Sequence, residues 1–261
     1  MKDCALRLPV SGLDIRLQEP AGVEDMLLLD AKVFDAELAV ALLTQIAVSP
    51  DGSRVDWFHL SLTDLDTALL LTRCMLFGEQ IWANAICPSE GCAAPIEISF
   101  DIQDYLAHHA ARQPRGVQPS EEPGWFQFQD DEILFRVPVV ADQLAIAHHP
   151  HPRQELVQRC MCPTDLKARQ VKRVEKAMEA IAPSLAGTLQ GKCVECGAEV
   201  ELFFDPQQFI LRELRNQASF IYEDIHLLAF YYQWSEPAIL ALPRHRRMQY
   251  AEMIRQARRV A

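Results

Sequence analysis

The sequence predicts an α+β fold in which small antiparallel strands carry two cysteine knuckles, helices surround them, and a helical segment ends the chain. Two pairs of cysteines indicate this: Cys87 and Cys92 bracket one turn, and Cys193 and Cys196 bracket another much later. The residues that follow each pair are also alike, because CAAPIEISFDIQDYL (92–106) aligns without a gap on CGAEVELFFDPQQFI (196–210). A thiol pair in a turn, a strand, Phe-Asp and a helix are therefore expected twice.

Four thiolates brought together make the tetrahedral set that selects zinc or an iron–sulfur centre, because sulfur is a soft ligand. We predict a structural Zn²⁺ in a split zinc-ribbon-like core, held by Cys87, Cys92, Cys193 and Cys196. Four protein ligands would leave no open position at which the metal could activate water. The alternatives are disulfides and buried free thiols. Eight cysteines in an acidic chain that starts without a secretory signal fit a reducing cytoplasm better than a disulfide scaffold.

A second metal site is conceivable in the middle of the chain. Cys160 and Cys162 lie near a loop with three histidines, which are His148, His149 and His151. Their spacing matches no common ligand pattern, so solvated histidines beside a half-buried thiol are the preferred interpretation.

Composition limits the function. The chain has 261 residues, 49% of them hydrophobic, which is typical of a globular protein with a real core. Its net charge of −11 argues against general binding to nucleic acid or anionic membranes, and its longest apolar stretch is too short to cross a bilayer. The sequence contains no nucleotide-binding glycine loop, no Gly-x-Ser-x-Gly elbow and no His-Glu-x-x-His motif, so we predict a protein that is not an enzyme.

The first part of the chain, residues 1–112, is predicted to contain the first knuckle. Alternating apolar and polar residues around a Ser-Gly turn indicate a hairpin at 4–20, and helical periodicity follows at 21–31 and 35–48. A longer helix at 63–78 is expected to be capped by Thr63 and ended by Gly78. Strands at 79–86 and 96–100 flank the knuckle, and a short helix follows at 101–111.

An exposed loop rich in proline, glycine and charge is predicted at 113–124. Residues 125–205 then contain a hairpin that turns at Asp130-Asp131, three helical segments, of which the longest is capped by Thr164, and the second knuckle, which packs with the first. Residues 206–261 form the helical C-terminal segment, in which Ser235 caps a short helix. Phe230, Tyr231 and Trp234 are interpreted as core in preference to a binding platform.

Charge is uneven at the end of the chain. From Arg244 to Ala261 there are six arginines and one acid. This pattern is typical of a solvated helix face, or of a contact with an acidic surface on a partner or on the chain's own body.

Several segments resemble a family of baseplate hub and tail-assembly proteins from contractile-tailed phages and related injection systems. The most specific is IHLLAFYYQWSEPAILALPRHRRMQYAEMI (225–254), and the hairpin LRLPVSGLDIRLQEPAGVEDMLLL (6–29) also resembles that family. LLLTRCMLFG, the CPSEGC knuckle and ILFRVPVVADQLAIA resemble its middle part. Two positions depart from the family pattern: Gln233 stands in place of an expected histidine, and FRVPV in place of Phe-Arg-Leu-Pro-Thr.

The resemblance implies an assembly factor or chaperone, or a minor structural component, of a baseplate hub. Its partners would be hub, spike or tape-measure proteins, and it would act in the bacterial cytoplasm or in the baseplate of the finished particle. Arginine and aromatic side chains anchor protein interfaces. The contact residues expected on this basis are Trp234, Arg244, Arg246, Arg247 and Tyr250.

A nucleic-acid-binding regulator is the alternative function. A zinc ribbon with the helix–turn–helix pattern of SEPAILALPRHRRMQYAEMI could place Arg244 to Arg247 on phosphates. The net negative charge of the whole chain speaks against this alternative.

Overall fold

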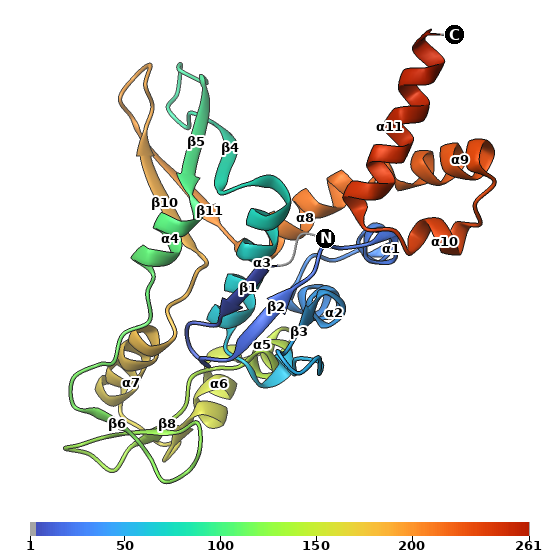
Figure 1. Cartoon of the computed structure of the whole chain (residues 1–261). Helices are drawn as coiled ribbons and strands as arrows, with labels where there is room; N and C mark the ends of the chain where they lie inside the picture. The colour runs from blue at the N-terminus through green and yellow to red at the C-terminus, as the bar shows by residue number, and fades with distance from the viewer. Residues whose placement is uncertain (1–3, 261) are drawn as a thin grey trace.

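The computed structural model describes residues 4–260 and confirms a mixed α+β fold of helices and small antiparallel sheets (Figure 1). Two long hairpins, β4–β5 and β10–β11, project side by side from a helical body, and the helices α9 to α11 form a separate arm at the C-terminal end. The helices α6 and α7 and the short strands β6 to β9 lie at the opposite end of the body from these hairpins.

The body begins with the predicted hairpin, β1 (Cys4–Arg7) and β2 (Asp14–Leu17), to which the short β3 (Ala47–Val48) adds a third strand. Helices α1 (Gly22–Asp30), α2 (Ala36–Ile46) and α3 (Leu62–Phe77) follow, with a short 3₁₀ turn at Trp57–His59. Gly78 ends α3 as predicted, with a φ of 88° that favours glycine.

The N-terminal cap of α3 differs from the prediction. Ser61, two residues before Thr63, caps the helix, because its side chain accepts a hydrogen bond from the amide of Asp64. The hydroxyl of Thr63 instead donates to the carbonyl of Pro183, 2.8 Å away. Thr63 therefore joins two distant parts of the chain instead of starting the helix.

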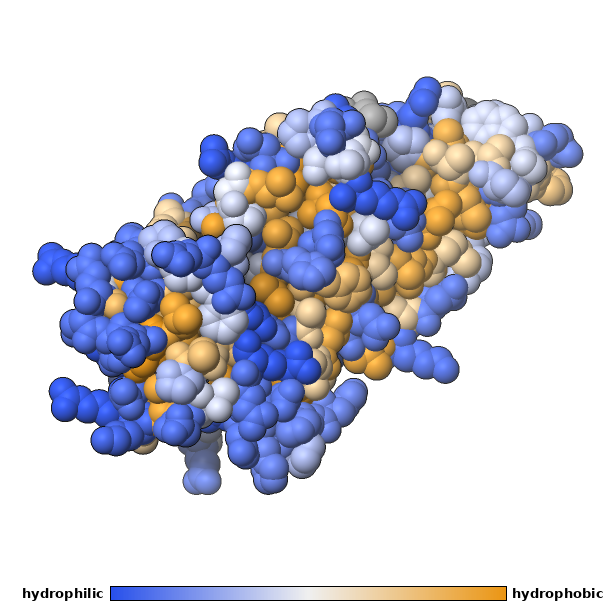
Figure 2. Space-filling model, turned by 90° about the horizontal axis from the view of Figure 1, so that it is seen from below, coloured by the Kyte–Doolittle hydropathy of each residue, from blue (hydrophilic) through white to orange (hydrophobic). Residues whose placement is uncertain are grey.

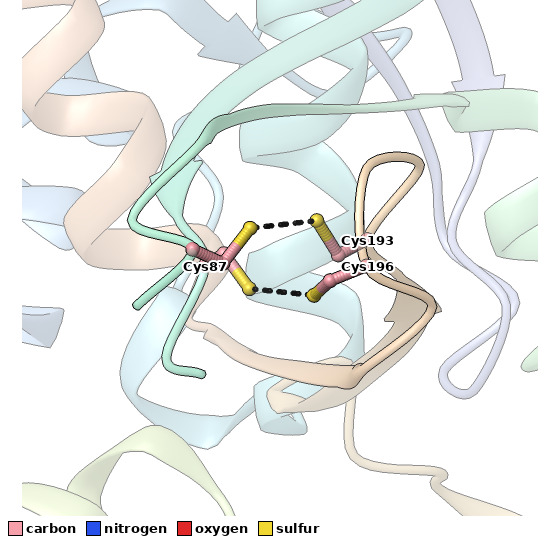
Figure 3. A group of neighbouring side chains, drawn as sticks. Cys87, Cys193 and Cys196 are labelled. Atoms are coloured by element: carbon pink, nitrogen blue, oxygen red, sulfur yellow. Dashed lines mark hydrogen bonds between the residues drawn. The ribbon is translucent and has the colours of Figure 1, made fainter. Parts of the chain in front are cut away.

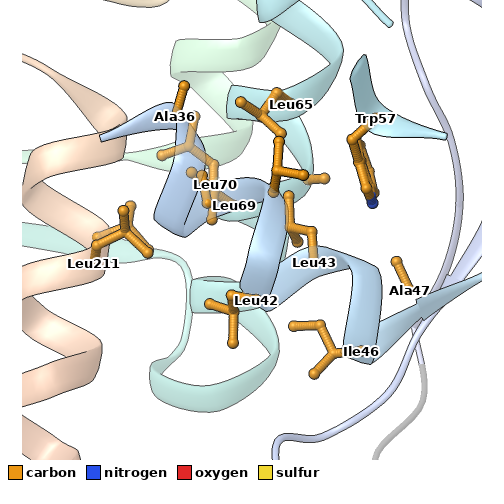
Figure 4. Close-up of a cluster of buried hydrophobic side chains, with 14 of the residues drawn as sticks. Ala36, Leu42, Leu43, Ile46, Ala47, Trp57, Leu65, Leu69, Leu70 and Leu211 are labelled. Atoms are coloured by element: carbon orange, nitrogen blue, oxygen red, sulfur yellow. The ribbon is translucent and has the colours of Figure 1, made fainter. Parts of the chain in front are cut away.

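The main core lies between α2, α3 and α8 (Pro206–Ala218) (Figure 4). Leu42 and Leu69 are fully buried within it, and Leu211 of α8 packs against them. Although α8 begins the C-terminal region of the sequence, its apolar face therefore belongs to the same core as the first helices. Burying each such leucine contributes about 2 kcal/mol.

A second, smaller core holds the middle of the chain. Strands β6 (Val117–Pro119), β7 (Phe126–Phe128), β8 (Leu134–Phe135) and β9 (Met161–Cys162) form one sheet, and α7 (Ala168–Ile181) packs its apolar face against it. Helices α5 (Val140–Ile146) and α6 (Pro152–Cys160) connect this sheet to the main body.

Two predictions for this region are corrected. The stretch 113–124 is not wholly an exposed loop, because it contains β6, where Val117 is buried. Helix α7 begins later than expected: Lys167 stands at its N-terminal cap, and the side chain of Gln170 accepts the amide proton of Lys167. Thr164 lies outside the helix.

The C-terminal arm consists of α9 (Ile221–Tyr232), α10 (Glu236–Leu240) and α11 (Arg244–Val260). Its own core is small and centres on Leu228, Ile239 and Ala251, which are fully buried. The arm meets the body at α1, where Gly22 lies so close to α10 that an added Cβ would come within 2.8 Å of the Leu240 Cα.

Buried ion pairs hold this arm to the body. The carboxylate of Asp25 on α1 is fully buried and accepts hydrogen bonds from the guanidinium groups of Arg244 and Arg247 on α11. Arg247 also pairs with Asp224 of α9, which in turn pairs with Arg255. The pKa of Asp224 is raised, chiefly because burial disfavours its charged form, although the neighbouring arginines oppose this effect.

The expectation that Arg244 and Arg247 contact a partner is therefore wrong for this structure. Both side chains are buried, with relative exposures of 4% and 2%, and their charges are matched by the chain's own carboxylates. Of the other C-terminal arginines, Arg246 and Arg258 are exposed and Arg255 is ion-paired, while the side chain of Arg259 lies outside the described residues. The arginine-rich segment thus contacts an acidic surface of the chain's own body.

Replacing Asp25 with alanine is expected to destabilise the protein by about 3–5 kcal/mol, because Arg244 would be left buried without a countercharge. Chemical denaturation followed by circular dichroism would measure this change. Asp56→Ala serves as the control, since it removes an exposed carboxylate that pairs only with His59, and it should cost less than about 1 kcal/mol. Equal, small losses in both variants would contradict the importance of the buried network.

Candidate metal centre

The four cysteines of the two knuckles lie at the tips of the two projecting hairpins. Strands β4 (Gln80–Ile86) and β5 (Pro95–Asp101) form the first hairpin, and β10 (Gly187–Lys192) and β11 (Glu199–Phe204) form the second. Because the hairpins lie side by side, the turns at their ends face each other (Figure 1).

Backbone hydrogen bonds shape each turn around its first cysteine. The amide of Cys87 donates to the carbonyl of Ala94 at 2.9 Å, and the amide of Cys193 donates to that of Ala198 at 2.8 Å. The second turn is tightened further by Gly197, whose amide donates to the carbonyl of Cys193 and whose φ of 73° suits glycine. Each turn therefore presents two cysteines toward the other turn.

The four sulfur atoms form a compact cluster (Figure 3). They lie within 4.8 Å of one another, with Cys87 Sγ 3.6 Å from Cys196 Sγ and Cys92 Sγ 3.9 Å from Cys193 Sγ. A tetrahedral ion with metal–sulfur bonds of about 2.3 Å would set its ligands about 3.8 Å apart. All four are free thiols, so the four predicted cysteines lie together in one group that could hold a single metal ion.

Electrostatics differ between the sulfurs. The backbone amides of Cys196 and Glu195 face the sulfur of Cys193 and lower its pKa to about 7. The amide of Ser89 acts in the same direction on Cys87, but burial and the neighbouring thiols outweigh it and raise the pKa of Cys87 to about 12. The surroundings thus favour the thiolate form of Cys193 near neutral pH, whereas a metal would have to displace the proton of Cys87.

The sequence repeat is also a spatial repeat at the base of the hairpins. Phe100 and Phe204, which occupy equivalent positions, meet edge to face with ring centroids 5.2 Å apart. The aspartates that follow them, Asp101 and Asp205, each cap the next helix by accepting backbone amide protons. For Asp101 that helix is α4 (Ile102–His108), and for Asp205 it is α8. The hairpins are therefore fixed at their base, to each other and to the helices that follow them.

The second possible metal site is not formed in the described part of the chain. Cys160 is buried and donates to the carboxylate of Asp142, which also accepts two hydrogen bonds from Arg136. Burial is the main cause that raises the pKa of Cys160 to about 12, so this thiol is protonated and inert. Cys162 is exposed, and no group of three potential ligands includes either of them or the histidines at 148–151.

The remaining expected contact residues differ in their surroundings. Trp234 and Tyr250 are half-buried and pack edge to face within the arm, 5.1 Å apart, so each at least supports the fold. Arg246 is exposed.

The interpretation of Phe230 and Tyr231 as core is wrong, since they are 65% and 47% exposed. The sequence contained a signal for Phe230, because Leu227 and Leu228 already fill the inner face of α9 and Phe230 lies away from it, toward the side of Tyr222. Tyr231 follows these leucines by four and three residues, so helical periodicity contained no such signal for it.

Comparisons with protein-family models, with curated proteins and with solved structures find no significant match to this chain. In the described residues, no helix combines the length and the apolar composition that a membrane span requires.

Changing Cys87 or Cys196 to serine is expected to abolish metal retention, because three thiolates and a hydroxyl bind such an ion poorly. Since bound metal would join the two hairpins, the melting temperature should fall by roughly 10 °C or more. Metal analysis and thermal melting would test both effects. The control is Cys162→Ser, which alters an exposed thiol outside the cluster and should change neither. A Cys87→Ser protein with full metal content would contradict the assignment.

Proposed function

We propose that the ion held by the four cysteines is Zn²⁺ and that it is structural. Four sulfur ligands from two tight turns suit a single tetrahedral ion, and the distances between the sulfurs are short enough for one. An iron–sulfur cluster would need the sulfurs further apart, because several iron atoms would have to fit between them. No position is left over for substrate, so the ion would stabilise the fold without performing chemistry.

Native mass spectrometry tests the identity of the ion. We expect one zinc per chain, which a strong chelator removes with loss of folded charge states. A protein without metal, in which each pair of cysteines has lost two mass units, would show disulfides and contradict the proposal. Bound iron would contradict the choice of zinc.

We further propose that the chain is a non-enzymatic assembly factor or minor structural component of a phage-type contractile tail baseplate hub. The resemblance of the segments at 6–29 and 225–254 motivates this proposal. Its partners would be hub, spike or tape-measure proteins, met in the host cytoplasm while the tail is built or retained in the finished baseplate.

The exposed aromatic face of α9 is the observation that best supports a protein-binding role. Tyr222 and Phe230 are 58% and 65% exposed, and Tyr231 lies beside Phe230 with its ring 5.1 Å away. Large apolar side chains gathered on one exposed surface are typical of protein interfaces, where aromatic residues supply much of the binding energy. Elsewhere, on the underside of the molecule, apolar residues also reach the surface in places among hydrophilic residues (Figure 2).

The structure offers less support for a nucleic-acid-binding regulator. That function needs the arginines at the start of α11 to contact phosphates, but Arg244 and Arg247 are buried against carboxylates. Only Arg246 of this group faces solvent. A basic surface at this position would therefore require the arm to come apart.

Replacing both Tyr222 and Phe230 with serine is expected to reduce capture of the tail partner at least tenfold, since two aromatic anchors would be lost. The melting temperature should change little, because both side chains are exposed. Pull-down from phage-infected cells with identification of hub, spike and tape-measure proteins would measure capture.

Phe203→Ser is the matched control, because Phe203 is equally exposed but lies on the β11 hairpin. Capture that survives the α9 changes, or that is lost equally in the control, would contradict a contact through α9.

A further inference from the structure

A cavity of about 320 Å³ lies in the body, away from the cysteines and from the C-terminal arm. It is formed where the start of α3, the second half of α7 and the start of α8 meet, and the segment after α7 closes one side. Its size is in the range of small-ligand sites in proteins. Sequence patterns could not predict this cavity, because its walls come from four separate stretches of chain.

Every titratable side chain that lines this cavity is acidic. These are Asp66, Glu175, Glu179 and Asp205, and no lysine, arginine or histidine is among the lining residues. Among the residues that the structure describes, Glu175 alone of these four has a basic partner, since Arg153 donates to it from the outer surface at 2.8 Å. The cavity therefore carries a negative charge that no basic side chain among its lining residues neutralises.

Asp66 is the innermost of these acids and has unused hydrogen-bonding capacity. It is only 5% exposed, yet it lines the cavity. Its Oδ1 atom accepts a hydrogen bond of 2.9 Å from Gln207 Nε2, while Oδ2 accepts none from any described residue. Oδ2 is not among the side-chain atoms that are buried from solvent without a partner, so it faces the open cavity and can accept a hydrogen bond from a donor there.

The two glutamines beside Asp66 extend this pattern. Because Nε2 of Gln207 donates to the carboxylate of Asp66, the side-chain oxygen of Gln207 faces Gln143. This oxygen accepts a hydrogen bond from Gln143 Nε2, with 3.5 Å between the two heavy atoms. Gln143 is then left with its oxygen buried and without a donor among the described residues. The chain of amides thus ends in a further unpaired acceptor, and both unpaired acceptors call for a ligand that donates.

Burying the ionised carboxylate of Asp66 costs free energy when no ligand is bound. Desolvation raises its pKa to about 7, and the negative charge of Asp205 adds to this effect, although the hydrogen bond from Gln207 opposes it. A fixed positive charge beside Oδ2 would offset the desolvation and keep the carboxylate ionised.

A metal ion is a poor candidate for this charge. Within the described residues, the four cysteines form the one group in which three or more metal-ligating atoms lie close together, so the carboxylates here are too dispersed to coordinate a common ion. Leu62, Met178 and Leu185 supply apolar wall between them. A cationic head that reaches Asp66 would therefore have an apolar passage for its stem.

We propose that this cavity binds a cationic group on an aliphatic stem, which is an alkylammonium or an alkylguanidinium. Such a group is found on small amines and on the lysine and arginine side chains of proteins. The head donates to Asp66 Oδ2, and the stem packs against the apolar wall. The proposal does not rest on a role in tail assembly.

A structural role for Asp66 is the competing explanation, because its bond to Gln207 joins α3 to α8. Asp66→Asn separates the two roles: asparagine can still accept from Gln207 but carries no charge. The melting temperature of this variant should be equal to or higher than that of the original protein, because a buried carboxylate is replaced by a neutral amide.

The experiment is an NMR titration of the ¹⁵N-labelled full chain. n-Pentylamine represents a free amine, Nα-acetyl-lysine N-methylamide and Nα-acetyl-arginine N-methylamide represent protein side chains, and 1-pentanol is the uncharged analogue. We expect saturable shifts of the Asp66 and Gln207 amides at roughly millimolar cation, with none for pentanol. Whichever cation binds more tightly identifies the source of the group.

Two further measurements make the test specific. Asp66→Asn should weaken binding at least tenfold, whereas Glu121→Gln, which removes an exposed charge elsewhere, should leave it unchanged. Because protonation of Asp66 removes its charge, the original protein should bind about tenfold more weakly at pH 6 than at pH 8, and the asparagine variant should lose this dependence. Absence of saturable shifts with all three cations, or undiminished affinity in Asp66→Asn, would overturn the proposal.

Discussion

The meeting of four cysteine sulfurs is the interaction on which the projecting part of the molecule depends. Each of the two hairpins has only two strands, and an isolated two-stranded hairpin is marginally stable in water. At their tips, the hydrophobic contacts are limited to a small cluster around the sulfurs, in which Ile96 and Val200 are the buried aliphatic side chains. The apolar contacts at this end are too few to stabilise the hairpins, so the contact between their tips depends on the four cysteines. A bound ion would join the two hairpins into one rigid unit.

The C-terminal arm is attached to the body by a different kind of interaction. There the contact with the body is made largely by charged groups, with Asp25 and Asp224 facing Arg244 and Arg247 in an environment without solvent. Buried ion pairs add little net stability compared with apolar packing, but breaking one is costly, so they favour a single docking geometry over alternatives. The close approach of Gly22 to α10 restricts that geometry further.

The parts of this structure that the sequence predicted are those determined by neighbouring residues. Strand alternation, the two Cys turns and the terminator Gly78 follow from local rules, and the aligned repeat correctly indicated that the knuckles pack together. Local rules failed where distant contacts compete with them. Thr63 has a side chain that could cap α3, but its hydroxyl donates to the carbonyl of Pro183 instead. The arginines of α11 have the sequence pattern of a solvated helix face, although their partners lie on α1 and α9. The acidic cavity could not be predicted, because its lining residues come from separate segments and no single segment contains a recognisable pattern.

The ion pair between Asp25 and Arg244 joins residues 219 positions apart, and this has a consequence for synthesis on the ribosome. Arg244, which supplies a countercharge for the buried carboxylate of α1, is made 219 residues after Asp25. The first cysteine pair likewise waits for the second. An unfinished or truncated chain would contain a carboxylate and thiols without partners, and such a chain is open to proteases and chaperones. The buried charges of α1 are therefore matched only once α11 has also been made.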